Sequence, residues 1–201
     1  DTNIQQAAYK ALGSNRGAAV VIEPSTGKIL AMVSKPSYNP NTIVEDWDSL
    51  NANTEGILVN RATQGQYAPG STFKVVTTLA FMRQNPDYQN YSYRCTGEIT
   101  AGKNEIHCFG NEVHGRVDLA DSLAYSCNTS FSNIGLSLNV DKFRDTAEDL
   151  LFDSELPCPL VYNESSFNLK SDDGDAAIAM TAFGQGKLQV SPYPPLQITA
   201  C

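Results

Sequence analysis

Two apolar runs joined by a short polar link constrain the fold most. Residues 18–22 and 29–33 are apolar throughout, and Glu23-Pro24-Ser25-Thr26-Gly27-Lys28 joins them. Pro and Gly in such a link are typical of a turn between antiparallel strands. Strands without polar alternation are usually covered on both faces. The sequence therefore predicts a β-hairpin packed between helices.

Helical periodicity recurs elsewhere in the chain. Apolar spacing predicts a short packing helix over 4–12, ended by Gly13, and a helix over 72–83 that follows Pro69-Gly70-Ser71. Residues 35–53 are expected to form an extended surface connection, and 88–115 a long irregular excursion of the kind that is usually functional. Further helices are predicted over 117–125, 129–138, 142–151 and 176–183. No shift in composition marks a boundary, so we expect one domain over 1–201.

The charge balance argues against nucleic acid as a partner. Of 201 residues, 14 are Lys or Arg and 22 are Asp or Glu, for a formal net charge of -8. A surface of this sign repels phosphate backbones rather than releasing their counterions. No apolar run approaches the roughly 18 residues of a membrane helix. We therefore expect no nucleic-acid binding and no membrane span within this chain.

Five cysteines leave the redox state open. Because the count is odd, at least one thiol stays free unless it pairs between chains. Cys95 and Cys108 bracket one polar loop and can form a local disulfide in an oxidising compartment. A zinc site is the alternative, with four candidate ligands: Cys95, His107, Cys108 and His114. Their spacing lacks the paired short-range ligands of structural zinc sites, so we expect no metal and no cofactor.

Ser71 and Lys74 place a hydroxyl and an amine three residues apart on a predicted helix. Side chains at this spacing share one face, within reach for proton transfer. In the first turn of a helix, free backbone N–H groups and the helix dipole favour an alkoxide and the oxyanion formed after attack. Burial among apolar neighbours would lower the pKa of the lysine enough for it to act as a base. The alternative is a capping serine beside a solvated lysine.

Spacing alone does not single out this pair. Ser25-Thr26-Gly27-Lys28 has the same spacing but lies in the predicted hairpin turn, without a helix start behind it. Ser126-Cys127-Asn128 falls between two predicted helices, where a loop can direct polar groups into a cleft. There Ser126 would relay a proton and Asn128 would hold a substrate amide. Ser-x-Asn recurs elsewhere in the chain, so these residues alone favour helix capping over a catalytic role.

The segment 97–103 matches most of a phosphate-binding loop, which would imply a nucleotide-dependent enzyme. Asn104 stands where that loop requires Ser or Thr, and no apolar strand precedes Gly97. Gly110 and Asn111 break any following helix. We therefore reject a nucleotide site here.

Longer segments carry a more specific signal. They are 23–34 (EPSTGKILAMVS), Asn60-Arg61-Ala62, 67–74 (YAPGSTFK), His114-Gly115 before Ser126-Cys127-Asn128, and Gly184-Gln185-Gly186. In these segments, and over most of its length, the chain resembles the transpeptidase domain of class B penicillin-binding proteins. The resemblance implies that Ser71 is the acylated nucleophile and Lys74 its base. It implies Ser126 as a catalytic residue and Asn128 as a substrate-binding residue of the second active-site motif.

The resemblance also implies a fold and a reaction. The fold is α/β (α+β type), serine β-lactamase/transpeptidase-like, with a five-stranded antiparallel sheet flanked by helices. The reaction is that of a peptidoglycan D,D-transpeptidase: the D-Ala-D-Ala end of one stem peptide acylates the serine, and a second stem peptide takes the acyl group. β-Lactam antibiotics mimic that substrate and leave a slowly hydrolysed acyl-enzyme. Such bacterial proteins are membrane-anchored, act outside the cytoplasm with the cell-wall synthesis machinery, and here would be anchored through a segment outside these residues.

One departure from the family pattern concerns its third motif. Lys-Thr-Gly or Lys-Ser-Gly, expected on a strand after the Gly-Gln-Gly segment, is missing from these 201 residues. Missing with it would be the last strands, one oxyanion donor and the groups that hold the substrate carboxylate. We therefore expect residues 1–201 to be the N-terminal and central part of the domain, with an incomplete sheet. Penicillin is expected to label Ser71 in the parent protein and to label the 201 residues weakly or not at all.

Two related functions remain open at this stage. One is a non-enzymatic scaffold or β-lactam-sensing domain of the same fold, and the other is a β-lactamase. The segment 67–74 and Asn60-Arg61-Ala62 favour the transpeptidase. A persistent β-lactam adduct would indicate the transpeptidase, and rapid release of hydrolysed β-lactam would indicate the lactamase. No adduct on the complete protein would indicate the scaffold.

Overall fold

The computed structural model describes residues 1–156 and 160–193, which form two compact units. The first unit contains residues 1–67, 155–156, 160–165 and 190–193, and the second contains 68–154 and 166–189. None of the helices in these ranges has both the length and the apolar character needed to cross a membrane.

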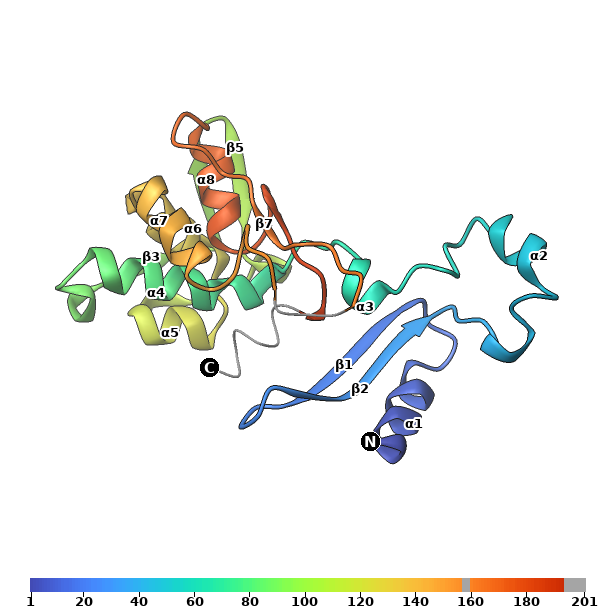
Figure 1. Cartoon of the computed structure of the whole chain (residues 1–201). Coiled ribbons are helices and arrows are strands. Elements are labelled where there is room, and N and C mark those ends of the chain that lie inside the picture. The colour runs from blue at the N-terminus through green and yellow to red at the C-terminus, as the bar shows by residue number, and fades with distance from the viewer. Residues whose placement is uncertain (157–159, 194–201) are drawn as a thin grey trace. The chain divides into compact units, whose positions relative to one another are not determined.

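The first unit begins with a helix and the predicted hairpin. Helix α1 (Thr2–Leu12) ends at Gly13, and strands β1 (Gly17–Glu23) and β2 (Lys28–Lys35) pair antiparallel. Gln5 fixes α1 to β2, because its amide nitrogen donates to Met32 O at 2.7 Å and its amide oxygen accepts from Met32 N at 2.8 Å. Figure 1 shows α1 beside the two blue strands. The helix and the hairpin are confirmed.

Within residues 1–156 and 160–193, the hairpin does not have the expected cover on both faces. Every residue of β1 is partly exposed, and only Ala31 and Val33 of β2 are buried. The connection over 35–53 is also less extended than predicted, since it contains a 3₁₀ turn (Pro40–Thr42) and α2 (Trp47–Asn51). Helix α3 (Arg61–Gln64) follows, capped by the side chain of Asn60.

The second unit contains the other predicted helices, each within a few residues of its expected range. A 3₁₀ turn, η2 (Gly70–Phe73), runs into α4 (Lys74–Gln84). The remaining helices are α5 (Leu119–Ala124), α6 (Asn128–Ser137), α7 (Val140–Glu148) and α8 (Asp175–Ala182). Helices α6 and α8 pack closely against each other (Figure 1). Gly135 permits this contact, because a Cβ added at that position would lie only 2.4 Å from Ala182 Cβ.

A cluster of phenylalanines holds the start of α4 in place. The ring of Phe73 lies 5.4 Å from that of Phe152 and 5.9 Å from that of Phe143, which in turn lies 5.1 Å from Phe167. All four side chains are buried. Because Phe73 closes the turn that carries Ser71, this core fixes the position of that turn.

The excursion over 88–115 is more regular than the sequence predicts. Strand β3 (Tyr93–Cys95) pairs with β6 (Gly115–Val117), and β4 (Glu98–Ala101) pairs with β5 (Asn104–His107). Two short 3₁₀ turns, η3 (Tyr88–Asn90) and η4 (Phe109–Asn111), complete it. Strands of three or four residues are too short to show alternation in a sequence. The rejected nucleotide loop lies in β4 and the turn after it, where a strand follows instead of a helix.

Short strands also join the two ends of segment 166–189, where β7 (Ser166–Phe167) pairs with β8 (Leu188–Gln189). No sheet within the described residues has more than two strands. The five-stranded sheet implied by the family resemblance is therefore not formed within them.

Candidate active site

Ser71 and Lys74 lie together at the start of α4. Ser71 is exposed in the 3₁₀ turn, whereas the Lys74 side chain is fully buried at 0% exposure. Lys74 Nζ lies 3.2 Å from Ser71 Oγ. The structure thus brings the two predicted groups within hydrogen-bonding distance.

Lys74 Nζ is surrounded by oxygen atoms that carry no net charge. It lies 2.6 Å from Ser126 O, 2.8 Å from Ser126 Oγ and 2.7 Å from Asn128 Oδ1. None of these partners is a carboxylate. Burial lowers the pKa of Lys74 to about 8, against a smaller opposing effect of the Cys127 and Cys108 sulfurs. About a tenth of the amine is therefore neutral at pH 7, far more than for a solvated lysine.

Ser126 and Asn128 reach Lys74 from the junction of α5 and α6. Ser126 adopts a left-handed backbone (φ 52°), which is uncommon for a residue other than glycine, and its Oγ lies 2.9 Å from Ser71 Oγ. Asn128 opens α6, and its amide nitrogen donates to His107 O at 3.2 Å. That bond orients the Asn128 oxygen toward the lysine. All four predicted site residues therefore meet at one place.

The second Ser-x-x-Lys segment lies elsewhere. Ser25 is exposed in the turn between β1 and β2, and Lys28 is exposed at the first position of β2. No helix start and no apolar surroundings accompany them. The pair thus lacks the features that lower the pKa of Lys74.

A cavity of about 540 Å³ opens onto Ser71. The Gly184 segment forms one of its walls: Gly184 O accepts from Gly70 N at 2.9 Å, and a Cβ at Gly184 (φ 84°) would lie 1.8 Å from Gly70 O. Only glycine fits this contact, which places Gln185 at the cavity. The lining residues are Gly70, Ser71, Phe109, Glu112, His114, Tyr125, Ser126, Asn128, Phe183 and Gln185.

Several residues that line the cavity lie outside the sequence motifs described above. Phe109, Glu112, Tyr125 and Phe183 were not predicted as site residues. Phe109 is 89% exposed and Tyr125 55% exposed, which is unusual for aromatic side chains. The one available signal is the length of the excursion over 88–115, the segment to which Phe109 and Glu112 belong.

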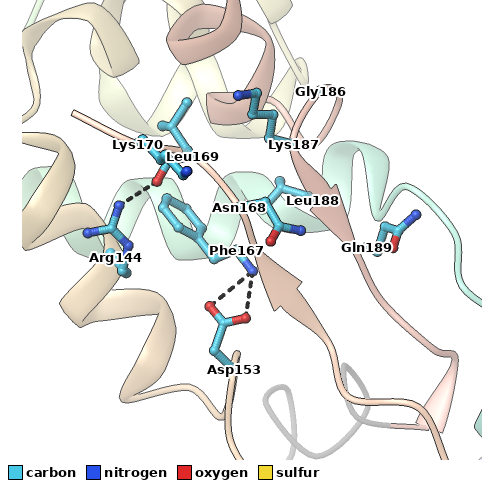
Figure 2. A pocket seen from close by; sticks show the side chains of 10 residues that line it. All are labelled: Arg144, Asp153, Phe167, Asn168, Leu169, Lys170, Gly186, Lys187, Leu188 and Gln189. Atoms are coloured by element: carbon cyan, nitrogen blue, oxygen red, sulfur yellow. Dashed lines mark hydrogen bonds between the residues drawn. The ribbon is translucent and has the colours of Figure 1, made fainter. Parts of the chain in front are cut away.

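A larger cavity in the same unit, of about 740 Å³, is lined by a different set of residues, which Figure 2 shows. Three of its four charged side chains already have partners: Asp153 accepts from Phe167 N at 3.1 Å, Arg144 donates to Leu169 O, and Lys187 pairs with Asp173. None of the predicted site residues lines it. The smaller cavity is therefore the candidate active site.

Sequence comparison agrees with this geometry. The family described as "Penicillin binding protein transpeptidase domain" matches residues 17–200. This chain belongs to that family. The penicillin-binding protein resemblance drawn from the motifs is thus confirmed, and so is the mixed helix-and-sheet fold class.

Known penicillin-binding proteins match nearly the whole chain. The peptidoglycan D,D-transpeptidase PbpA of Mycolicibacterium smegmatis is 37% identical over 98% of this chain and 43% of its own length. A ceftriaxone acyl-enzyme structure of penicillin-binding protein A from M. tuberculosis is 33% identical with a TM-score of 0.88, covering 100% of this chain and 48% of that one. The Helicobacter pylori penicillin-binding protein (PBP2) complexed with MreC is 25% identical with a TM-score of 0.88, covering 100% and 40%. The chain therefore spans less than half the length of these relatives.

Proposed function

We propose that this chain supplies the acylating centre of a peptidoglycan D,D-transpeptidase. Ser71 is the nucleophile, Lys74 its base, Ser126 the proton relay and Asn128 a substrate-binding group. The observation that carries this assignment is the buried Lys74 Nζ, which lies 3.2 Å from one serine hydroxyl and 2.8 Å from the other. The relatives described as D,D-transpeptidases and the antibiotic acyl-enzyme structure support the same reaction class.

The hydrogen bonds of Lys74 decide which protons can move. A neutral amine has two hydrogens and one lone pair. Ser126 O and Asn128 Oδ1 can only accept, so they take the two hydrogens at 2.6 and 2.7 Å. The lone pair then faces the hydroxyls of Ser71 and Ser126, which can donate. Lys74 is therefore poised to take the Ser71 proton as the oxygen attacks a carbonyl.

The acyl transfer balances with these groups. Ser71 Oγ bonds to the carbonyl carbon of the penultimate D-Ala, the C–N bond to the terminal D-Ala breaks, and the leaving amine takes a proton from Lys74 through Ser126. Backbone N–H groups at the start of the helix stabilise the oxyanion. The amine of a second stem peptide then attacks the ester carbonyl carbon, the bond from that carbon to Ser71 Oγ breaks, and the proton that the amine loses passes to Ser71 Oγ. In a β-lactam the broken amide is within a ring, so the leaving amine stays attached.

The relatives indicate a setting for this activity. One relative forms an acyl-enzyme with a β-lactam antibiotic, and another binds MreC. We infer that β-lactams acylate Ser71 and that the protein works with the cell-wall synthesis machinery on stem peptides. That substrate lies outside the cytoplasm, so we place the protein there, held at the membrane by a segment other than these residues.

The rate of acylation should depend on pH through Lys74. Because burial lowers its pKa to about 8, the neutral form grows as pH rises and is nearly complete above that value. We expect the second-order rate of penicillin acylation to rise about tenfold per pH unit below the pKa and to level off above it. Stopped-flow labelling of the full-length protein, corrected for hydrolysis of the antibiotic alone, measures this. A rate that is flat or falls across that range would contradict Lys74 as the base.

A further inference from the structure

Three cysteines and a histidine meet in the second unit, beside the second active-site motif. Cys95, Cys108 and Cys127 are 1%, 3% and 0% exposed, and a ligand atom from each of them and from His114 lies within 4.8 Å of every other. They come from four separate places: the end of β3, the turn after β5, the residue before β6 and the N-terminus of α6. Of the four zinc ligands considered from the sequence, only His107 is absent.

The spacing of these atoms fits a tetrahedral metal site. Cys108 Sγ lies 3.7 Å from Cys95 Sγ and 3.7 Å from Cys127 Sγ, and His114 Nδ1 lies 3.4 Å from Cys95 Sγ. Zinc–sulfur bonds of about 2.3 Å in a tetrahedron place sulfurs about 3.8 Å apart, and a zinc–nitrogen bond of about 2.0 Å places nitrogen about 3.5 Å from sulfur. A disulfide instead requires sulfurs about 2.05 Å apart. The disulfide that Cys95 and Cys108 could form in an oxidising compartment is therefore absent from the structure, and both thiols are free.

The surroundings also suit bound thiolates and a metal-bound imidazole. The Thr129 hydroxyl lies 3.3 Å from Cys95 Sγ and 3.4 Å from Cys127 Sγ, and Ser130 N donates to Cys127 Sγ at 3.4 Å. With His114 Nδ1 facing the sulfurs, its other nitrogen lies 3.5 Å from Glu112 Oε2. Metal-binding histidines usually donate their second ring N–H to such a carboxylate.

We propose that Cys95, Cys108, Cys127 and His114 bind one structural Zn²⁺. Three thiolates and one imidazole are a donor set that selects zinc over Mg²⁺ or Ca²⁺, and four protein ligands leave no open position for catalysis. The expectation of no metal rested on irregular spacing along the sequence. The fold removes that objection, because it brings the ligands together from separate segments.

The site would connect the excursion to the catalytic motif. Cys127 lies between Ser126 and Asn128, whose side chains contact Lys74. Zinc would tie that backbone to Cys95 and Cys108, and hence fix the hydroxyl and amide that face the lysine. This consequence rests on the proposed function, whereas zinc binding itself does not.

The two histidines of the chain provide a matched test. Full-length protein without an affinity tag, purified under reducing conditions, should contain one zinc per chain by elemental mass spectrometry. Co²⁺ exchanged into it should give the visible and near-ultraviolet bands of a tetrahedral thiolate site. His114→Asn should lose the metal, while His107→Asn, which changes an exposed side chain outside the cluster, should keep it. Glu112→Gln, which leaves all four ligands in place, should weaken zinc affinity about 10- to 100-fold.

Several results would overturn the site. Wild-type protein that takes up neither zinc nor cobalt when reduced, a disulfide among the three cysteines, or full metal content in His114→Asn would each do so. If His114→Asn does not fold, the wild-type cobalt spectrum and the Glu112→Gln affinity still decide. Chelation should slow acylation of Ser71 and lower the midpoint of thermal unfolding. Zinc-bound protein that never acylates would contradict the proposed function and leave the metal site intact.

Discussion

Replacing Ser71 with alanine abolishes covalent labelling of the full-length protein by penicillin. The substitution removes the only atom that forms the acyl bond, so we expect no adduct above background. Ser71 is exposed and lies in a 3₁₀ turn, where alanine is well tolerated. The change in folding stability should therefore stay within about 0.5 kcal/mol. Labelled penicillin followed by intact-protein mass spectrometry measures the loss, and thermal unfolding measures the stability.

The chain contains its own control for this variant. Ser25 opens the other Ser-x-x-Lys segment and lies exposed in the turn between β1 and β2. Ser25→Ala should acylate at the wild-type rate. An adduct that persists in Ser71→Ala, or that disappears in Ser25→Ala, would show that the nucleophile has been assigned to the wrong serine.

Replacing Lys74 with methionine should slow acylation about 10²- to 10⁴-fold, the range typical of a lost general base. Methionine has a similar length and fills the buried space, but it can neither accept the Ser71 proton nor hydrogen-bond to its neighbours. Ser126 O and Asn128 Oδ1 would then lose a donor at 2.6 and 2.7 Å. Leaving such acceptors unpaired costs about 1–3 kcal/mol of stability each. Reversible binding of penicillin, measured before acylation, should change much less than the acylation rate.

Lys28→Met is the matched comparison, since Lys28 holds the same place in the exposed segment. It should leave both the rate and the unfolding midpoint unchanged. A folded Lys74→Met protein that acylates within a few-fold of wild type would mean that the Ser71 proton leaves by another route. If Lys28→Met lowered the acylation rate as much as Lys74→Met does, the effect would not be specific to the site.

The local part of the site is predictable from sequence because it is a property of one helix. Ser71 and Lys74 are three residues apart, so helical geometry alone brings them to the same face. The distinction from Ser25 and Lys28 also depends on local features, namely the helix start and the apolar stripe behind it. The structure places both pairs as predicted.

The long-range part is not predictable from spacing. Ser126 and Asn128 reach Lys74 across more than 50 residues, and Ser-x-Asn occurs at other places in the chain. Only the likeness to a known family selected this copy. Their meeting depends on how α5 and α6 pack on α4, which periodicity does not specify.

The cysteine cluster likewise depends on contacts between distant segments, which the sequence pattern does not predict. Cys127 was not considered as a ligand, because nothing local in the sequence joins it to Cys95 and Cys108. Two pairs of very short strands bring those segments together, and strands of that length leave no alternation to detect. The length of the excursion therefore predicts a functional role, whereas the arrangement of its cysteines can be seen only in the structure.

The central claim is that Ser71 is the residue that becomes acylated. The most direct test is to incubate the full-length wild-type protein with a labelled penicillin, digest it, and locate the adduct by peptide mass spectrometry. We expect one persistent adduct, on the peptide that contains Ser71. An adduct on any other residue, or a folded protein that carries none, would contradict it.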